Sequence, residues 1–208
     1  LGNEFSNHEL SNILDKYNYK DKISYELINN ENTLFELATK LIANGNVIGW
    51  FQGKMEFGPR ALGNRSILAD PRNPNMKKII NMKIKRRESF RPFAPSVLSK
   101  FQKEWFKGNF DNPYMASLAT VKQDKKSFVP AITHIDGTAR IQSVDFDLNP
   151  RFSSLLNAFY KLTGVPILLN TSFNENEPIV FKPEHALDCL LRTDMDAIFI
   201  NNYMIKRK

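Results

Sequence analysis

The sequence predicts an α/β (mixed α+β) fold, in which helices flank one mixed sheet. Short apolar strands alternate with amphipathic helices, but without the regular spacing of repeated βαβ units. Hydrophobic residues make up 42% of the 208 residues and include 16 Phe, which is enough for a packed core. No internal repeat or low-complexity linker divides the chain, so residues 1–208 are expected to form one domain.

The N-terminal quarter predicts two helices and a strand. A short helix is expected after a loop within residues 1–22. Thr33 and Glu36 have the spacing of a capping box, in which each side chain bonds a free amide of the first helical turn. Gly45 stands where a C-terminal cap is expected, and Val47–Phe51 is a compact apolar strand.

The next elements are separated by prolines. Asn73 and Pro74 predict a helix start, with Asn as the N-cap and Pro at the first position, and the helix is expected to fray near Arg87. Phe90–Leu98 is predicted to be extended. Because it contains two prolines, which cannot donate to a sheet ladder, we expect an edge strand or a rigid crossing segment.

The C-terminal half continues the alternation. Its predicted elements are a strand at Tyr114–Val121, a polar loop at Lys122–Pro130, a strand at Thr138–Val144, a helix at Ser153–Thr163 closed by Gly164, a buried strand at Pro166–Leu169, a helix starting at Lys182–Glu184, and strands at Ala197–Ile200 and Tyr203–Ile205.

Positive charge is concentrated in one region. The formal net charge is +7, yet residues 1–46 carry seven acids and only four Lys or Arg. Residues 54–107 carry fourteen Lys or Arg and four acids, and most of these bases lie in Phe57–Pro95. Stiff backbone rich in Gly and Pro surrounds them, as the recognition of a phosphorylated small molecule requires. The stretch therefore predicts an anion-binding site.

Several classes of protein are excluded by absent signals. The single Cys189 excludes an internal disulfide and fits a reducing, cytoplasmic location. No apolar run reaches membrane-spanning length, and no signal peptide opens the chain, so no membrane partner is expected. Walker A, CxxC, HExxH and GxSxG motifs are missing. The chain starts with Leu-Gly and not with Met, which suggests a piece cut from a longer protein.

Two groups of basic residues have a functional and a structural interpretation. Arg60 and Arg65 lie five residues apart in a Gly-flanked turn, and one of them, Arg65 more readily than Arg60, is open to a structural role. In extended backbone, Lys85, Arg87 and Arg91 would form a cationic row. As a solvated helix end, the same charges would only complement the helix dipole, an equally good interpretation.

Two later segments add polar groups. Arg140 stands on a predicted strand after an Asp-Gly turn. His134 lies before that turn, and a structural role is favoured for it because a lone histidine is more often structural than catalytic. Asn170 and Ser172 follow a buried strand, where α/β sheets commonly bind ligands, although the same residue types also form plain turns.

Four long strings occur in order along the chain: GKMEFGPRALGNRSILADPR, KIKRRESFRPFAPSVL, THIDGTARIQ and LLNTSFNENEPIV. Together they resemble the C-terminal domain of the O-carbamoyltransferases of the nodulation-protein and antibiotic-tailoring type. The resemblance implies a YrdC-like fold, a twisted mixed sheet with flanking helices and a concave basic face. It covers nearly the whole chain.

The resemblance also implies a reaction and its residues. Carbamoyl phosphate would release carbamate, which attacks the α-phosphate of ATP to give carbamoyladenylate and pyrophosphate. The implied catalytic residues are Lys85, Arg87, Arg91 and Ser172. The implied residues that hold the nucleotide and phosphates are Arg60, Arg140, Asn170 and Ser172. Mg²⁺ is expected to arrive with ATP, held by phosphates and waters, and no protein metal ligand is expected.

Partners follow from the same resemblance. A separate N-terminal Kae1-like domain would pass the carbamoyl group to a small-molecule hydroxyl in a biosynthetic reaction. A homodimer is left open, and nucleic acid is not expected. Two alternatives remain: a YrdC-like RNA- or nucleotide-binding module without autonomous catalysis, and a regulatory domain that has lost its catalytic residues.

Overall fold

The structure is a computed structural model that describes residues 2–88, 91–108 and 112–208. Within them, eight strands form one sheet in the order β1-β11-β10-β2-β3-β9-β4-β8. Their bounds are β1 Ile23–Leu27, β2 Ile48–Phe51, β3 Arg65–Ala69, β4 Ala94–Leu98, β8 Gln142–Val144, β9 Ile167–Ser172, β10 Ala197–Ile200 and β11 Tyr203–Arg207. A second sheet joins β5 (Phe106–Lys107), β6 (Ala119–Val121) and β7 (Thr138–Ala139).

The sheet is mixed, as predicted. The β10–β2 and β4–β8 pairs are parallel, and the other pairs of the large sheet are antiparallel. Strand β9 runs between β3 and β4 and is antiparallel to both. The carboxyl end of β9 therefore lies beside the starting ends of β3 and β4, and β8 starts at that same edge because it is parallel to β4.

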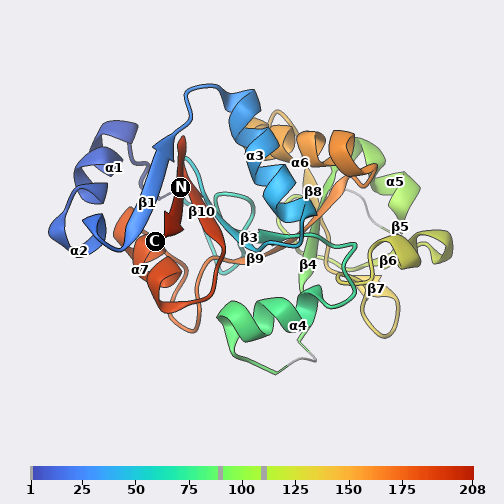
Figure 1. Cartoon of the computed structure of the whole chain (residues 1–208). Coiled ribbons are helices and arrows are strands. Elements are labelled where there is room, and N and C mark those ends of the chain that lie inside the picture. The colour runs from blue at the N-terminus through green and yellow to red at the C-terminus, as the bar shows by residue number, and fades with distance from the viewer. Residues whose placement is uncertain (1, 89–90, 109–111) are drawn as a thin grey trace.

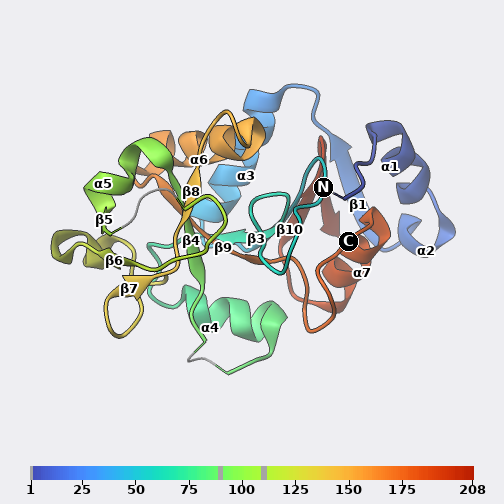
Figure 2. The same cartoon turned by 180° about the vertical axis from the view of Figure 1, so that it is seen from behind.

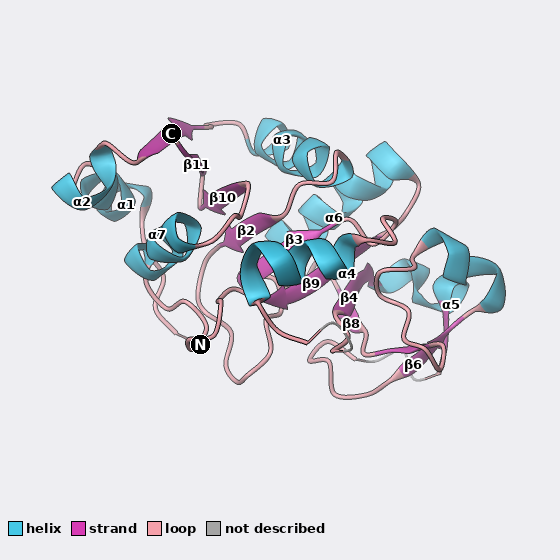
Figure 3. Cartoon of the chain, turned by 60° about the horizontal axis from the view of Figure 1, so that its bottom comes forward, coloured by secondary structure: helices cyan, strands magenta, loops and turns pink. Residues whose placement is uncertain are grey.

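Helices cover both faces of the sheet (Figure 1). Helices α3 (Glu31–Ala43) and α6 (Pro150–Thr163) pack against each other on one face, and the view from behind shows the same pair (Figure 2). Helices α4 (Met76–Ile80) and α7 (Pro183–Arg192) lie on the opposite face, which comes forward in Figure 3. The short helices are α1 (Asn7–Leu14), α2 (Tyr17–Lys20) and α5 (Gln102–Trp105).

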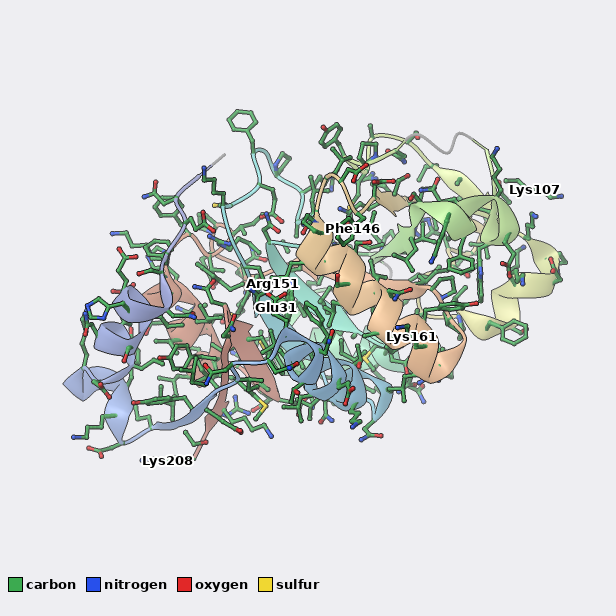
Figure 4. All side chains as sticks on the ribbon, turned by 90° about the horizontal axis from the view of Figure 1, so that it is seen from above. Glu31, Lys107, Phe146, Arg151, Lys161 and Lys208 are labelled. Atoms are coloured by element: carbon green, nitrogen blue, oxygen red, sulfur yellow. The ribbon has the colours of Figure 1, made fainter. Side chains whose placement is uncertain are left out.

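The start of α6 is tied to α3 by an ion pair. Arg151 and Glu31 lie together between the two helices in the view from above (Figure 4), with an N–O distance of 3.1 Å. Both residues stand in the first turn of their helix. The pair connects the ends of two helices that cover the same face of the sheet.

Most predicted elements are confirmed. The short helix expected within residues 1–22 is α1, and its buried residues are Leu10, Ile13 and Leu14. Gly45 lies just past the end of α3 with φ of 86°, and Gly164 caps α6 with φ of 75°. The predicted apolar strands at β2, β9 and β10 are fully or largely buried, because they lie inside a sheet covered on both faces, and β11, next to the edge strand β1, is buried at Tyr203 and Ile205.

Two predicted helix starts are wrong. The cap of α3 is Asn30, whose side chain accepts from the amide of Thr33. Thr33 thus lies inside the helix, because an Asn three positions earlier already satisfies the amide that a cap must satisfy. Helix α4 begins at Met76, since Asn73 instead closes a turn by accepting from the amide of Asn75.

Three predicted strands also differ. Of Phe90–Leu98, residue 90 is outside the described residues, and Ala94–Leu98 forms β4 between β9 and β8 and not at an edge. The ladder with β8 begins only at Ser96, one residue after the proline. Tyr114–Val121 is a strand only in its last three residues. Thr138–Val144 is divided between two sheets, with Arg140 at the crossing.

The polar segment Lys122–Pro130 contains a 3₁₀ turn at Gln123–Phe128, and another lies at Ser99–Phe101. None of the helices in the described ranges has the length and apolar character needed to cross a bilayer.

Candidate functional site

A cavity of about 290 Å³ lies at the carboxyl end of β9. The polar side chains that line it are Arg60, Arg87, Arg91, His134, Arg140, Asn170, Thr171 and Ser172. Three of these arginines stand just before strands: Arg60 before β3, Arg91 before β4 and Arg140 before β8. Because these strands all start where β9 ends, the sheet topology gathers residues that are remote in the sequence. We call this cavity the arginine pocket.

Three guanidinium groups of the pocket have no acid partner. Within the described ranges, Arg60, Arg87 and Arg140 make no hydrogen bond or ion pair. Burial, and then the nearby positive charge of Arg140, lower the pKa of Arg60 from its ordinary value. Burial, and then Arg91, lower the pKa of Arg87. Cations placed together without acids are costly unless an anion compensates them.

Arg87 and Arg91 differ in their surroundings. The guanidinium of Arg87 lies 4.8 Å from the ring centroid of Phe93, and its buried Nε atom has no hydrogen-bond partner among the described residues. Arg91 instead pairs with Glu88 at 3.2 Å, and both side chains are more than half exposed. An exposed pair of this kind is weak, so Glu88 can release Arg91 to a ligand at little cost.

Lys85 lies beside the pocket and not in its lining. It ends a π-helical turn (Asn81–Lys85) that continues α4, and Arg86 follows with a φ of 43°. The predicted extended row of Lys85, Arg87 and Arg91 is therefore wrong, because the backbone is helical up to Lys85. An adjoining hollow of about 380 Å³ does contain Lys85, and it shares Arg87, Arg91 and Ser172 with the pocket.

The ammonium group of Lys85 is buried and fully engaged. Its Nζ atom donates to the carbonyl oxygens of Ser172 (2.6 Å) and Asn174 (2.8 Å), and it contacts Ser172 Oγ (3.2 Å) and Asn174 Oδ1 (2.6 Å). The Ser172 hydroxyl also donates to Asn174 Oδ1 at 2.7 Å. Burial, and then Arg87, lower the pKa of Lys85 to about 7. Lys85 thereby fixes the chain where β9 enters the pocket.

Asn170 has its amide group turned to protein atoms. Its Nδ2 donates to Ala61 O (3.1 Å) and lies within hydrogen-bond distance of Ser96 Oγ (2.9 Å) and Gln142 Oε1 (3.2 Å). Its Oδ1 is buried and without a partner among the described residues. Because the Nδ2 donors of Asn170 are already used by protein atoms, the structure does not show them free for a ligand. The role of Asn170 at nucleotide phosphates stays a prediction.

His134 is a pocket residue that the sequence analysis favoured as structural. Its Nδ1 lies 3.2 Å from the hydroxyl of Thr138, which itself donates to Asp136 at 2.8 Å. Burial, and then Lys77, lower its pKa, so the imidazole is neutral near pH 7. The available signal was its place in the segment THIDGTAR, close before Arg140. Met115 and Phe93 also line the pocket and carried no polar signal.

Arg65 is structural, which settles the question left open by the sequence. It is fully buried, and its guanidinium donates to the carbonyls of four residues, namely Asn3, Gln52, Gly53 and Asn64. The guanidinium also lies 3.5 Å from the ring centroid of Phe51. Burial lowers its pKa to about 10. Arg86 pairs with Glu175 at 3.3 Å.

No group of three or more His, Cys, Asp or Glu residues able to hold a metal ion occurs in the part of the chain that the structure describes. The charged groups of the pocket lining are arginines. A divalent cation in this pocket would therefore need its oxygen ligands from an anionic ligand and from water.

The fold and the pocket define an α/β domain that presents arginines at one edge of a mixed sheet. Residues 39–207 match the family described as Carbamoyltransferase C-terminus, and the chain belongs to this family.

Curated relatives agree with this assignment. The chain is 50% identical over 175 residues to nodulation protein NolNO of Sinorhizobium fredii, covering 82% of this chain and 26% of the relative. It is 42% identical over 228 residues to an uncharacterized protein of Synechocystis, covering all of this chain and 37% of that protein. It is 42% identical over 135 residues to the 3'-hydroxymethylcephem-O-carbamoyltransferase of Amycolatopsis lactamdurans, covering 65% of this chain and 25% of that enzyme. The chain thus spans roughly a quarter to two fifths of these relatives.

Solved structures confirm the mixed α/β fold class. Full-length HypF in its phosphate- and nucleotide-bound form superposes with a TM-score of 0.54 at 15% identity, covering 86% of this chain and 22% of HypF. HypF of T. kodakarensis gives a TM-score of 0.50 at 13% identity, covering 89% of this chain and 23% of that protein. At these identities the likeness concerns the fold alone.

Proposed function

We propose that this chain carries out the carbamoyladenylate-forming half of a carbamoyl transfer. Carbamoyl phosphate and ATP are the substrates. Water cleaves carbamoyl phosphate to carbamate and inorganic phosphate inside the arginine pocket. A carbamate oxygen then attacks the α-phosphorus of ATP, the bond from that phosphorus to the β-phosphate oxygen breaks, and pyrophosphate leaves.

One observation carries the proposal: three guanidinium groups without acid partners line one cavity in a member of a carbamoyltransferase family. Carbamoyl phosphate and ATP bring several negative charges together, and their repulsion opposes the reaction. Fixed cations offset this repulsion and stabilise the charge that develops on the leaving pyrophosphate. Planar guanidinium groups also bind phosphate oxygens in pairs, which fixes the orientation of the substrate.

The residues divide by their surroundings. Arg60 and Arg140 are proposed to bind phosphate oxygens, and Arg87 and Arg91 to stabilise the reacting phosphorus centre. Ser172 ends β9 at the pocket, and its hydroxyl is proposed to contact a phosphate oxygen in exchange for its bond to Asn174. Lys85 would keep Ser172 and the following turn in place and, when protonated, add positive charge to the adjoining hollow.

Mg²⁺ is proposed to enter with ATP. The surroundings fit a metal held by the nucleotide, since no acidic cluster of the described residues competes for it. Bound in this way, the ion would supply charge neutralisation at the phosphates. The arginines would orient the phosphates that the ion does not cover.

The second half of the transfer is proposed to lie outside this chain. The curated relatives are two to four times as long as the part that the chain matches. A Kae1-like domain in the remaining length would pass the carbamoyl group from the adenylate to the hydroxyl of a small molecule. We place this biosynthetic reaction in the cytoplasm, where ATP is supplied, and a homodimer would be compatible with it.

The test is exchange of labelled pyrophosphate into ATP by the purified chain. We expect exchange only when carbamoyl phosphate is present, because only then does carbamoyladenylate form. Labelled pyrophosphate can attack this adenylate and re-form ATP, which then carries the label. Replacement of exposed Lys107, which lies on β5 outside the pocket lining, by Met serves as the matched control and should leave exchange unchanged. A folded chain that binds ATP without exchange would contradict the proposal. Tight RNA binding with a steep salt dependence would support the RNA-binding alternative.

A further inference from the structure

The loop that carries Arg60 is held from two sides, although Arg60 itself is free. We call Phe57–Asn64 the arginine loop. Its backbone has a positive φ at two glycines, Gly58 (100°) and Gly63 (105°), which residues with a side chain rarely adopt. At Gly63 a Cβ atom would lie 2.2 Å from the ring of Phe152, so only glycine fits there. Such a path needs fixed partners for the peptide groups around it.

Glu56 supplies the partners on the first side. Its Oε1 atom accepts hydrogen bonds from the amides of Leu62 (2.6 Å), Asn64 (3.1 Å) and Arg65 (3.2 Å). The carboxylate is buried, with 7% of the residue exposed. Hydrogen bonds from backbone amides to a carboxylate are among the stronger kind. This side fixes the amides that follow Arg60.

Gln142 and Asn170 supply the partners on the second side. Gln142 Nε2 donates to the carbonyl of Leu62 at 2.8 Å, and Asn170 Nδ2 donates to the carbonyl of Ala61 at 3.1 Å. These carbonyls belong to the two residues directly after Arg60. The residues of this hydrogen-bond network come from three strands: Gln142 from β8, Asn170 from β9 and Ser96 from β4.

Ser96 connects the two amides. Its hydroxyl donates to Gln142 Oε1 at 2.6 Å and accepts from Asn170 Nδ2 at 2.9 Å. Gln142, Asn170 and Ser96 are all buried, with 4%, 1% and 0% exposed. Gln142 must therefore donate at one end and accept at the other, which an amide does and a carboxylate or an apolar group does not. This network fixes the orientation of the Gln142 amide, because turning it over would place its oxygen against the carbonyl of Leu62 and its NH₂ group against the Ser96 hydroxyl that now donates to it.

We propose that Gln142 and Ser96, together with Asn170, are positioning residues that aim Arg60 into the arginine pocket. They contact the backbone beside Arg60 and act on the ligand only through that arginine. Asn170 is reassigned by the same argument, since its donors hold the arginine loop instead of a phosphate. The inference rests on the proposed function in one respect, namely that Arg60 binds a phosphate group.

A double-mutant cycle separates positioning from general stabilisation. Binding of inorganic pyrophosphate is measured by calorimetry for the full 208-residue chain, for Arg60→Met, for Gln142→Met and for the double variant. We expect each single change to weaken binding about 10-fold, the loss of one charge-assisted contact. We expect the double variant to bind no more weakly than Arg60→Met alone. Gln102→Met, at an equally buried glutamine outside the pocket lining, is the matched control and should leave binding unchanged.

Each outcome decides a different claim. If the losses of Arg60→Met and Gln142→Met multiply in the double variant, or if a folded Gln142→Met binds normally, the positioning role is overturned and the proposed function stands. If Arg60→Met binds pyrophosphate normally, the phosphate-binding role of Arg60 fails and the inference fails with it. A chain that binds no pyrophosphate contradicts the proposed function.

Ser96→Ala covers the case in which Gln142→Met does not fold. It removes one hydroxyl from the same network and leaves the amides in place. We expect a smaller loss of pyrophosphate binding that again disappears in the Arg60→Met background. Near-ultraviolet circular dichroism and the thermal transition confirm the fold of each variant. An additive loss for a folded Ser96→Ala would also overturn the positioning role.

Discussion

Arg60 and Arg65 stand five residues apart at one turn and have opposite environments. Arg65 is fully buried and donates to four backbone carbonyls, and its guanidinium lies over the ring of Phe51. Arg60 lines the arginine pocket and has no hydrogen-bond or ion-pair partner in the described part of the chain. The two residues look alike in the sequence, and only their partners distinguish them.

The difference shows how one turn serves both the fold and the site. Arg65 holds together three segments of the backbone, at Asn3, at Gln52–Gly53 and at Asn64, so its positive charge is compensated by the protein itself. The positive charge of Arg60 is left for a ligand. A cation that the protein does not neutralise is a better indicator of function than a cation count, because structural arginines contribute equally to the count.

The largest expected effect is on stability and tests the structural role of Arg65. Arg65→Met should lower the free energy of unfolding by about 3 kcal/mol or more, because it leaves four carbonyl groups and the buried Glu56 without their cation. Urea denaturation monitored by circular dichroism measures this loss. An unchanged unfolding midpoint would show that Arg65 is not the structural member of the pair.

The next effect breaks the functional side. Arg60→Met should leave the free energy of unfolding within about 0.5 kcal/mol, since the side chain has no partner to lose. The same change should reduce carbamoyl-phosphate-dependent exchange of pyrophosphate into ATP by about 100-fold, the usual loss for one charge-stabilising donor. Denaturation and exchange assays on one protein batch give both values. A stability loss similar to that of Arg65→Met would remove the distinction between the two arginines.

A third effect, the smallest for each pH unit, sharpens the comparison at Lys85, a buried cation that borders the pocket. Its pKa is about 7 in the folded protein, below the value of about 10.4 expected for an unfolded chain. Between these two values the unfolded state binds the additional proton, so this lysine makes the free energy of unfolding rise with pH. We expect that Lys85→Met reduces this rise by about 1.4 kcal/mol per pH unit between about pH 7 and 10.

Urea denaturation of both proteins across this pH range measures the difference. Titrating groups that do not interact with Lys85 contribute equally to the two proteins and cancel in the comparison. Parallel curves for the unchanged chain and Lys85→Met would mean that Lys85 keeps its ordinary pKa and is charged throughout. In that case its four oxygen partners would outweigh the effect of burial.

Local signals in the sequence predicted the secondary structure well where residues within or next to an element determine where that element begins and ends. Gly45 and Gly164 end helices because of their backbone freedom, and β2 and β10 are apolar throughout. The failures depend on distant partners. Pro95 lies in an interior strand because the ladder with β8 begins after it, and the division of Thr138–Val144 depends on which of two sheets each half joins. Periodicity does not contain this information.

The members of the site were predicted mostly from the four strings and not from spacing. The structure places Arg60, Arg87, Arg91, Arg140, Asn170 and Ser172 around one cavity, and it places Lys85 beside that cavity. Spacing failed at Lys85, because a π-helical turn replaced the expected extended row. The supporting residues Gln142, Ser96 and Glu56 had no local signal, since their function appears only through hydrogen bonds to the backbone of the arginine loop.

The most direct test of the central claim is a ³¹P NMR time course of the purified chain with Mg²⁺, ATP and carbamoyl phosphate. The account predicts that inorganic phosphate and pyrophosphate appear in equal amounts as ATP is consumed, because carbamate attacks the α-phosphorus. The same sample with Arg60→Met should remain nearly unchanged. Formation of ADP, or release of phosphate without pyrophosphate by the folded chain, would contradict the account.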